Sequence, residues 1–598
     1  VQSTVRQANS ILSSSWANEL IVQHGLEERP IFALNNDLPE TNIQGLGTTF
    51  TFGQSEFLPN RTDEEKWQLK DNVTWFRNNH QLKGGFEYIS AEIDNLFPRE
   101  LGGQYFFANV ADFLANRPRQ FDQGFGPTAG LNSFDYDTWG AFVQDTITLR
   151  NVTLDVGIRY DVQDIPEPVG NAYPQHPEFL TDFNNDDDNF APRLGFAWDV
   201  KGDGRSVLRG GVGQYYNFLP SILYAGPLAE IAGLYNRISL RCDLGANCPT
   251  YPNILTPDQF AREARASLNV TTVSPDLSAA ESLRTSLGFE QQLGQTYSVG
   301  IEAVYAQIDK AQRLVNVNAV PTGLTFGNLV VYDLRNPNRL YPDLQAVRQH
   351  VSDAEGEYTS VTLSTRKFAV GDSRFTWLAH YTWAEAIDQD SNERSTSTSF
   401  SLDPFNPELS EGRADYDVTH RFVASGTYEL PWGILVSGIL TWRTGTPYTA
   451  GIDTGAIGLN GLDAQGIETP VFLDRNGNVI DLTLANGMTP QQLSAFLAGQ
   501  GARLEERNNR DQPDFRNLDL RLSKTFGFGP VELELIGEVF NALNEENEFI
   551  TATNQVLFTG QLSGGVWTFR RNDDFGKSNS FNNLSFPRQY QAALKVRF

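Results

Sequence analysis

Residues 151–161 read NVTLDVGIRYD, a stretch in which apolar and polar side chains alternate. One face of an extended strand would carry Val152, Leu154, Val156, Ile158 and Tyr160. The other face would carry Thr153, Asp155, Gly157, Arg159 and Asp161. A dry protein core would not accept so much charge. The stretch is therefore typical of a strand that stands between lipid and a water-filled lumen, as in transmembrane β-barrels.

The same alternation recurs along the whole chain. Sixteen segments carry it: 15–27, 64–78, 81–88, 134–149, 151–161, 190–201, 205–216, 281–294, 296–307, 356–369, 373–386, 416–430, 433–444, 514–527, 529–543 and 586–598. Residues 1–11 are interpreted as the remnant of one earlier strand, although their alternation is weak. The chain is therefore predicted to be all-β, a transmembrane antiparallel outer-membrane β-barrel with 16 to 17 strands.

The connections between these segments are short and long in strict alternation. Tight turns are predicted near residues 79, 150, 202, 295, 371, 432 and 528. Long loops are predicted near 28–63, 97–133, 164–189, 217–280, 308–355, 387–415, 445–513 and 544–585. Outer-membrane barrels have short periplasmic turns and long extracellular loops. We therefore expect the rim of short turns to face the periplasm.

Composition excludes several other classes of protein. The 598 residues are 40% apolar and 12% aromatic, and no run approaches the roughly 18 apolar residues of a membrane-spanning helix. The formal net charge of -27 argues against nucleic acid as a partner, because a phosphate backbone needs a basic face. The six histidines are scattered without a nucleophile or a metal spacing. We therefore expect neither enzyme activity nor a cofactor.

The only two cysteines, Cys242 and Cys248, lie in the segment RCDLGANCP. Their spacing favours a small loop closed by a disulfide, formed in an oxidising compartment. Two alternatives stay open from the residues alone: a pair of free thiols and a pair of metal ligands. Metal sites usually need four ligands and closer cysteines, which weighs against the second alternative.

The segment 474–481, DRNGNVID, is rich in oxygen ligands. Asp474, Asn476, Asn478 and Asp481 weakly resemble a calcium loop on the extracellular side, but the glutamate at the twelfth position is absent. The alternative is an ordinary solvated turn. In the same loop, TPQQLSAFLAG at 489–499 combines a Thr-Pro start with helical spacing and predicts a short helix.

Carboxylates occupy one face of the predicted strand 529–543. Glu532, Glu534 and Glu538 alternate there with Val531, Leu533, Leu535 and Val539. We expect the glutamates to face the lumen and the apolar side chains to face lipid. An acidic lumen would favour cationic or metal-bearing ligands. The alternative is that the charge only keeps the lumen solvated.

Eight segments together carry a resemblance to a known family, and they follow one another in the family's order. They are DTWGAFVQDTITLRNVTLDVGIRYD (137–161), NFAPRLGFAWDVKGDGRSVLRGGVGQYY (189–216), YTWAEAID (381–388), DYDVTHRFVASGTYELPWG (415–433), RTGTPYT (443–449), NLDLRLSKTF (517–526), GEVFNALNEENEF (537–549) and PRQYQAALKVRF (587–598). From about residue 15 onward the chain resembles Oar-like TonB-dependent receptors, which are outer-membrane transporters.

The resemblance implies a barrel of about 22 strands, plugged by an N-terminal domain, that takes up a bulky or scarce ligand with energy delivered through TonB. Residues 1–598 are then the barrel portion, and the N-terminal extension, the plug and the first strands lie outside this sequence. The long loops 217–280 and 445–513 would form a vestibule that captures the ligand.

The implied partners are outer-membrane lipid and lipopolysaccharide, the barrel-assembly machinery, TonB through the missing plug, and a ligand that the sequence does not identify. The last strand includes Tyr590 and ends on Phe598, which resembles the signal by which outer-membrane barrels are recognised for assembly. Two other functions stay open: a passive porin with sixteen strands, and a surface-assembly barrel whose loops bind a surface lipoprotein or another protein.

Overall fold

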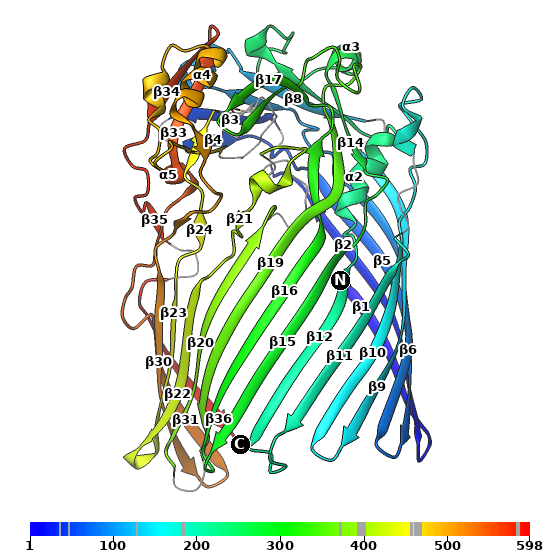
Figure 1. Ribbon diagram of the computed structural model, residues 1–598, viewed down its shortest axis with the longest axis vertical. Coiled ribbons are helices and arrows are strands. Elements are labelled where there is room, and N and C mark those ends of the chain that lie inside the picture. Colours follow the sequence, from blue (N-terminus) through cyan, green and yellow to red (C-terminus); the bar gives the residue numbers. More distant parts are fainter. Residues whose placement is uncertain are drawn as a thin grey trace.

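The structure, a computed structural model, describes residues 1–34, 37–45, 48–126, 130–180, 186–369, 373–391, 402–454, 459, 469–581 and 586–598. Long tilted strands form the wall of a barrel, and the loops above one rim fold into small sheets and helices (Figure 1). A search of the described helices found none long and apolar enough to cross a membrane.

Each strand of the wall pairs antiparallel with the next strand of the wall along the chain. Its members are β1 (Gln2–Ser13), β2 (Trp16–Ile31), β5 (Asn60–Arg77), β6 (His80–Leu96), β9 (Leu131–Leu149), β10 (Val152–Asp164), β11 (Asn189–Asp199), β12 (Ser206–Asn217), β15 (Ala280–Leu293), β16 (Tyr297–Asn316), β19 (Val347–Lys367), β20 (Phe375–Asp388), β22 (His420–Leu430), β23 (Ile434–Arg443), β30 (Phe515–Phe528), β31 (Val531–Phe540) and β36 (Gln589–Arg597). The described residues thus give seventeen wall strands joined by sixteen antiparallel pairings, which confirms the predicted 16 to 17.

Residues 1–11, which the sequence predicts to be the remnant of one earlier strand, do lie almost entirely in a strand, β1. β1 pairs with β2 over its whole length, from Ser13 opposite Trp16 to Gln2 opposite Leu26. Side-chain alternation is weak in β1 because polar residues stand on both of its faces. The pairing itself uses main-chain hydrogen bonds, which do not depend on that alternation.

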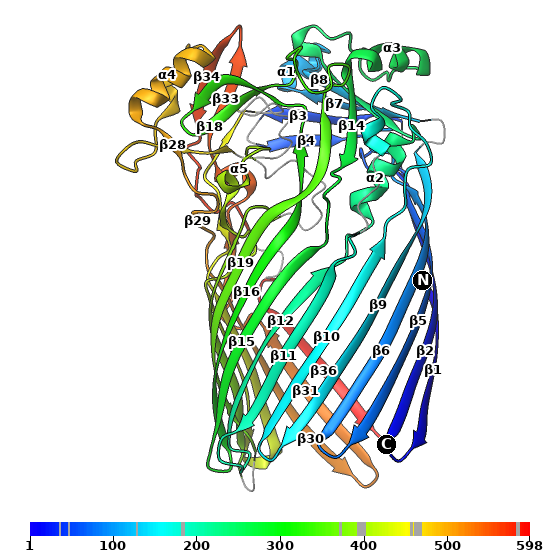
Figure 2. The same ribbon diagram turned by 45° about the vertical axis from the view of Figure 1, so that its right-hand side comes forward.

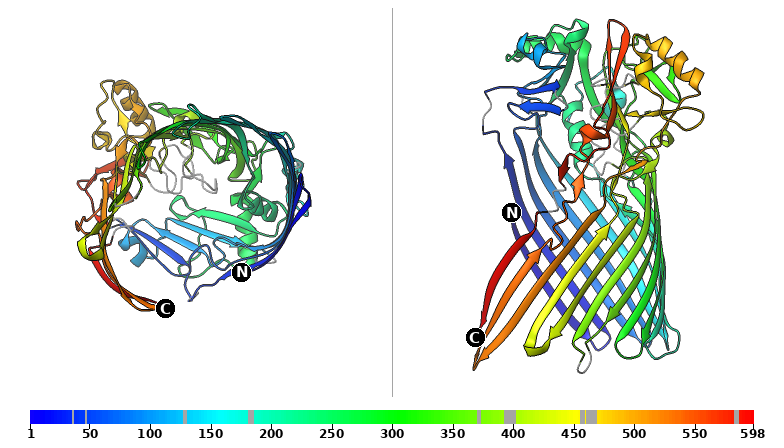
Figure 3. Two further views of the ribbon diagram at one scale, coloured as in Figure 1. Left: turned by 90° about the horizontal axis from the view of Figure 1, so that it is seen from below. Right: turned by 90° about the vertical axis from the view of Figure 1, so that its left-hand side faces the viewer.

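β1 and β36 are the two edges of the wall. Within the described part of the chain no pairing joins them, and the ring seen from below stays open between the two chain ends (Figure 3, left). Because sixteen antiparallel steps separate these two strands, they run in the same direction. An antiparallel barrel can therefore close between them only through an odd number of further strands. The alternative of a passive porin required sixteen wall strands, an even number, whereas the described residues form seventeen.

The outer face of the wall is apolar. Neighbouring strands expose large apolar side chains there, namely Leu287 of β15, Ile301 of β16 and Leu363 of β19. Ile301 stands directly opposite Leu363. Many of the side chains between them along the strands, such as Glu302, Ser286 and Ser364, are polar. This arrangement suits a wall with lipid outside and water inside.

Aromatic side chains form two belts on this outer face. Near the short-turn rim, Trp16 stacks on Trp75 with ring centroids 5.6 Å apart. Higher on the same two strands, His24 stacks on Trp67 at 4.3 Å. Eight residues of strand separate Trp67 from Trp75, a rise of about 20 Å for a strand tilted by about 40°. The belts therefore bracket an apolar band of the height found in outer-membrane barrels.

The predicted tight turns near 79, 150, 295, 432 and 528 are confirmed, because the described wall strands that flank each of them end within a few residues of the turn. The turn near 202 is slightly longer and joins β11 to β12. The connection near 371 lies partly outside the described residues. These turns share the lower rim in Figures 1 and 2, opposite the folded loops.

The long loops contain further strands and helices. The strands are β3 (Glu40–Gly45), β4 (Thr48–Phe52), β7 (Gln104–Phe107), β8 (Gln120–Phe125), β13 (Asn236–Arg241), β14 (Leu268–Val273), β17 (Val320–Phe326), β18 (Leu329–Asp333), β21 (Gly412–Arg413), β24 (Pro447–Tyr448), β25 (Gly451–Asp453), β26 (Thr469–Pro470), β27 (Phe472–Leu473), β28 (Arg503–Leu504), β29 (Arg510–Asp511), β32 (Glu548–Phe549), β33 (Val556–Ser563), β34 (Val566–Arg571) and β35 (Ser580–Phe581). The α-helices are α1 (Val110–Leu114), α2 (Ile222–Ile231), α3 (Pro257–Ser267), α4 (Pro490–Gln500) and α5 (Ala552–Gln555). Short 3-10 helices include η1 (Pro177–Leu180), η2 (Cys242–Leu244), η4 (Pro407–Ser410), η5 (Pro431–Gly433) and η6 (Leu482–Ala485).

Candidate functional site

Two folded lobes stand above the wall. The first, which we call the cap lobe, comprises the described residues of 40–52, together with 104–125 and 236–260, with β3, β4, β7, β8 and β13 in one sheet. Its core is aromatic: Tyr105 and Phe121 are fully buried, with ring centroids 4.6 Å apart. Seen from below, blue and light-blue strands of this lobe lie across the opening of the ring (Figure 3, left).

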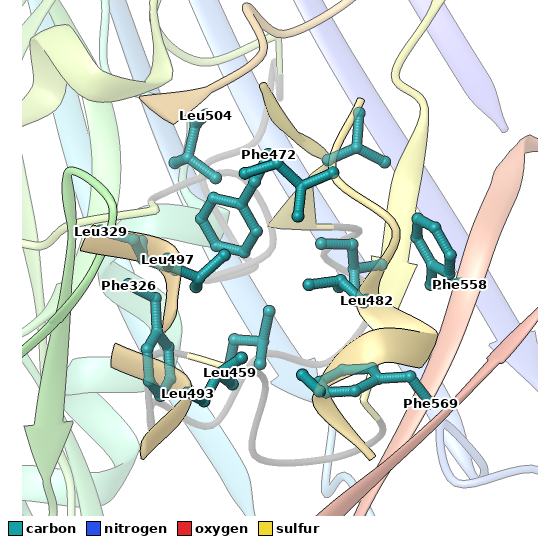
Figure 4. Packing of buried hydrophobic residues seen from close by; sticks show 14 of the residues in the cluster. Phe326, Leu329, Leu459, Phe472, Leu482, Leu493, Leu497, Leu504, Phe558 and Phe569 are labelled. Atoms are coloured by element: carbon teal, nitrogen blue, oxygen red, sulfur yellow. The ribbon is translucent and has the colours of Figure 1, made fainter. Parts of the chain in front are cut away.

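The second lobe, which we call the outer lobe, comprises residues 320–333, the described residues of 450–504, and 556–571. Its core gathers apolar side chains from all three segments (Figure 4), among them Phe326, Leu329, Phe472, Leu493, Leu497, Phe558 and Phe569. β25 and β33, which lie more than a hundred residues apart in the sequence, pair in parallel within it. Its helix α4 lies outside the ring of wall strands (Figure 3, left).

A cavity of about 740 Å³ lies between the cap lobe and the outer lobe. This volume is in the range that holds a small organic molecule. The cap lobe contributes charged residues to its lining: Asp112, Arg117, Arg119, Arg241 and Asp243. The outer lobe contributes mainly apolar residues: Phe326, Val331, Leu459, Leu562 and Trp567, together with Thr454. The cavity is therefore polar on one side and apolar on the other.

Two arginines on the polar side share one carboxylate. Arg241 donates from Nε and Nη2 to the oxygens of Asp243 at 2.9 and 2.6 Å, and Arg119 Nε lies 3.7 Å from Asp243 Oδ2. Burial, and next the charge of Arg241, lower the pKa of the Arg119 guanidinium, while Asp243 and Asp453 act in the opposite direction. The lining of the cavity thus holds three arginines and two aspartates, in a chain whose net charge is -27.

Three polar atoms of the lining residues are buried and unpaired. Arg241 Nη1, Thr454 Oγ1 and Trp567 Nε1 have no hydrogen-bond partner within the described ranges, and their residues are only 9%, 8% and 5% exposed. Buried polar atoms are nearly always paired in folded proteins. All three residues line the cavity.

The structure joins Cys242 to Cys248 by a disulfide, with the Cα atoms 5.6 Å apart. The bridge closes the chain directly after β13, around η2, and both cysteines line the cavity. Asp243 lies inside this closed loop and Arg241 directly before it. The disulfide therefore fixes the backbone that carries the shared carboxylate.

Replacing both cysteines by serine (Cys242→Ser with Cys248→Ser) is expected to destabilise this loop by about 2 kcal/mol, because the bridge closes a loop of only a few residues. We expect faster amide hydrogen exchange in peptides covering 236–250 and unchanged exchange in β15 and β16. Reduction of the unmodified protein should reproduce the effect. Equal exchange in the oxidised, reduced and serine forms would show that the bridge does not order the loop.

The predicted calcium ligands are used for other contacts. Asp474 Oδ1 accepts hydrogen bonds from the backbone N–H groups of Asn478 and Asn476, at 2.9 and 2.8 Å, and these bonds lower the pKa of the Asp474 carboxyl. Asp481 Oδ1 accepts from the backbone N–H and hydroxyl of Thr483 at the start of η6. This geometry favours the solvated turn over a calcium loop.

The predicted lumen carboxylates share one face of β31 and lie beside arginines. Arg521 lies 3.3 Å from Glu534 and 3.5 Å from Glu538, and Arg597 lies 3.5 Å from Glu532. Paired carboxylates attract a passing cation less than free ones do. The geometry therefore favours a role in keeping the lumen wall solvated.

Tyr590 and Phe598 lie at the end of the chain as expected from an assembly signal. Tyr590 stands on the last wall strand opposite Val539, and Phe598 directly follows β36 at the lower rim (Figures 1 and 2). Both side chains are exposed on the sheet. Recognition of these two residues by the assembly machinery stays a prediction.

No motif in the sequence predicts the cavity. Arg119, Arg241, Thr454 and Trp567 come from four separate stretches of the chain, and none belongs to a local motif. The one available signal was the pair of charged residues around Cys242, since a disulfide beside Arg241 and Asp243 indicates a fixed polar surface.

A sheet with an apolar, belted outer face and folded loops above one rim defines a class of protein, the integral outer-membrane β-barrel. The particular family follows from the sequence: a family model described as outer membrane beta barrel domain matches residues 6–591. The chain belongs to that family and is a multi-pass protein of the bacterial outer membrane. No curated protein matches the sequence.

Several solved structures are similar to the chain at low sequence identity. The outer membrane transporter YddB from Escherichia coli matches with a TM-score of 0.54 and 12% identity, over 99% of this chain and 62% of that chain. The FrpB iron transporter from Neisseria meningitidis (F3-3 variant) matches with 0.49 and 12%, over 99% and 62%. A mutant of the ferric enterobactin receptor PfeA from Pseudomonas aeruginosa matches with 0.49 and 10%, over 99% and 61%. The chain thus spans less than two thirds of the length of these transporters.

Proposed function

We propose that the chain is the wall and the extracellular face of a TonB-dependent receptor that takes up a bulky or scarce ligand. The observation that carries the proposal is the open wall. Seventeen antiparallel strands need an odd number of additional strands to close. Five more would complete the 22 strands of the family that the sequence resembles, and the fold shared with YddB over 62% of that chain supports a longer protein.

In this proposal the loops capture the ligand and a plug domain closes the lumen. The cap lobe narrows the mouth of the ring, which suits capture better than free diffusion (Figure 3, left). Energy delivered through TonB would displace the plug. Lipid and lipopolysaccharide would surround the belts, and the assembly machinery would recognise the last strand.

The test is the conductance of the full-length, natively purified protein in planar lipid bilayers. A plugged receptor is expected to show no steady current, whereas a passive porin holds open a water-filled channel. Urea at a concentration that leaves the barrel resistant to unfolding in detergent should open the channel, because a small plug unfolds before a closed barrel. A steady ohmic conductance without urea would contradict gated uptake and favour the porin.

A further inference from the structure

We propose that the cavity between the cap lobe and the outer lobe binds a small organic carboxylate with an aromatic or apolar body. Arg241 and Arg119 would hold the carboxylate, and the outer lobe would enclose the body. The inference rests on the proposed function and deepens it by naming the class of ligand.

The unpaired polar atoms select an acceptor-rich ligand. Arg241 Nη1 and Trp567 Nε1 can only donate hydrogen bonds, and Thr454 Oγ1 can donate one. An ionised carboxylate only accepts, and hydrogen bonds in which both groups are charged are the strong ones. A cation would instead meet two guanidinium groups. The three donors therefore fit an anion.

The charge balance points the same way. The guanidinium groups of Arg119 and Arg241 lie beside the carboxylate of Asp243, and Asp453 also acts on Arg119. Burial deprives both of much of their hydration, and a desolvated charge is costly unless it is paired. The lining holds three arginines against two aspartates, so a carboxylate supplied by a ligand would balance its charge.

The opposite wall of the cavity selects an apolar body. Phe326 and Leu459 are almost fully buried members of the outer-lobe core, and Trp567 stacks on Phe569 behind them at 5.4 Å. Indole and phenyl surfaces make favourable offset or edge contacts with another ring. A small aromatic acid satisfies both walls within about 740 Å³.

The cavity is open to the outside at its rim. The side chain of Arg117 is 70% exposed where it pairs with Asp112 at 2.9 Å, and Leu562 is also exposed. A ligand can therefore enter from the extracellular side. Arg117 differs from Arg241 in being solvated, with a side chain that is 70% exposed against 10%. It therefore provides a matched control, an arginine of the same cavity outside the buried part of the site.

The experiment uses the full-length protein in detergent and two probes, 5-fluoroindole-3-acetate and its neutral analogue 5-fluoroindole-3-acetamide, followed by fluorine NMR titration. We expect the acid to bind about tenfold more tightly than the amide, or better, because it alone makes charge-assisted hydrogen bonds. Arg241→Gln and Arg119→Gln should each remove about that preference. Arg117→Gln should change the affinity for the acid less than about twofold.

Thr454→Val provides a variant that alters the site without changing its charge. It should weaken binding of both probes equally and preserve the preference for the acid. Any of three results would overturn the assignment. They are equal affinity for the acid and the amide, no binding of either probe, and an unchanged preference for the acid in Arg241→Gln with the disulfide intact. The conductance of the same samples separates this proposal from the proposal of gated uptake. If the channel is closed and the acid does not bind, only the proposed class of ligand is wrong. If the channel is open and the acid binds, only gated uptake is wrong.

Discussion

Arginine in place of Leu287 is expected to destabilise the barrel by about 2–4 kcal/mol, the cost of placing this side chain on the lipid face near the middle of the membrane. Leu287 is exposed on β15 opposite Ala303, about 15 Å above the periplasmic turn that follows Leu293. The measurement is the urea midpoint of folding of the full-length protein into lipid vesicles.

The matched control is Glu302→Arg. Glu302 stands opposite Gly288, one residue along from the Leu287 pair, and its side chain points to the other face of the wall. Because that face borders water, arginine should be tolerated there within about 1 kcal/mol. Equal losses in the two variants would mean that the wall has been assigned the wrong lipid face.

Replacing Phe472 by alanine is expected to destabilise the outer lobe by about 3–5 kcal/mol, because it removes a large side chain from a closed core. Phe472 is 1% exposed and packs in the centre of the cluster (Figure 4). Amide hydrogen exchange of peptides from α4 should rise by orders of magnitude, while peptides from β15 and β16 keep their protection. The barrel itself should still fold.

Leu484→Ala is the control for this prediction. Leu484 belongs to η6 of the same lobe but is 67% exposed, so its loss should change stability by less than about 0.5 kcal/mol. Protection of α4 that survives Phe472→Ala would show that the lobe does not depend on this core. Loss of protection throughout the wall would show instead that lobe and barrel unfold together.

The wall was predictable from the sequence because each strand has lipid on one face and water on the other. That condition imposes a period of two on every segment, and residues 151–161 form β10 (Val152–Asp164) as expected. The same local logic located α4. Thr489 caps it and exchanges hydrogen bonds with Gln492, a capping box that lies entirely within the quoted segment.

The lobes were not predictable in the same way. β25 finds its partner β33 in another loop, and β3 pairs in parallel with β7. Such short strands are ordered by contacts between distant segments, so no local period marks them. The cavity could not be predicted for the same reason. Arg241 and Trp567 line it together only because the two lobes pack against each other.

We propose that these seventeen strands are part of a larger barrel. The most direct test is the intact mass of the natively purified protein, with mapping of its N-terminal peptides. We expect a mass well above the 66.7 kDa of this sequence, with upstream peptides long enough for a plug and an odd number of strands. A mass of 66.7 kDa with Val1 as the first residue would contradict it, since β1 and β36 would then have no further strands to close the wall.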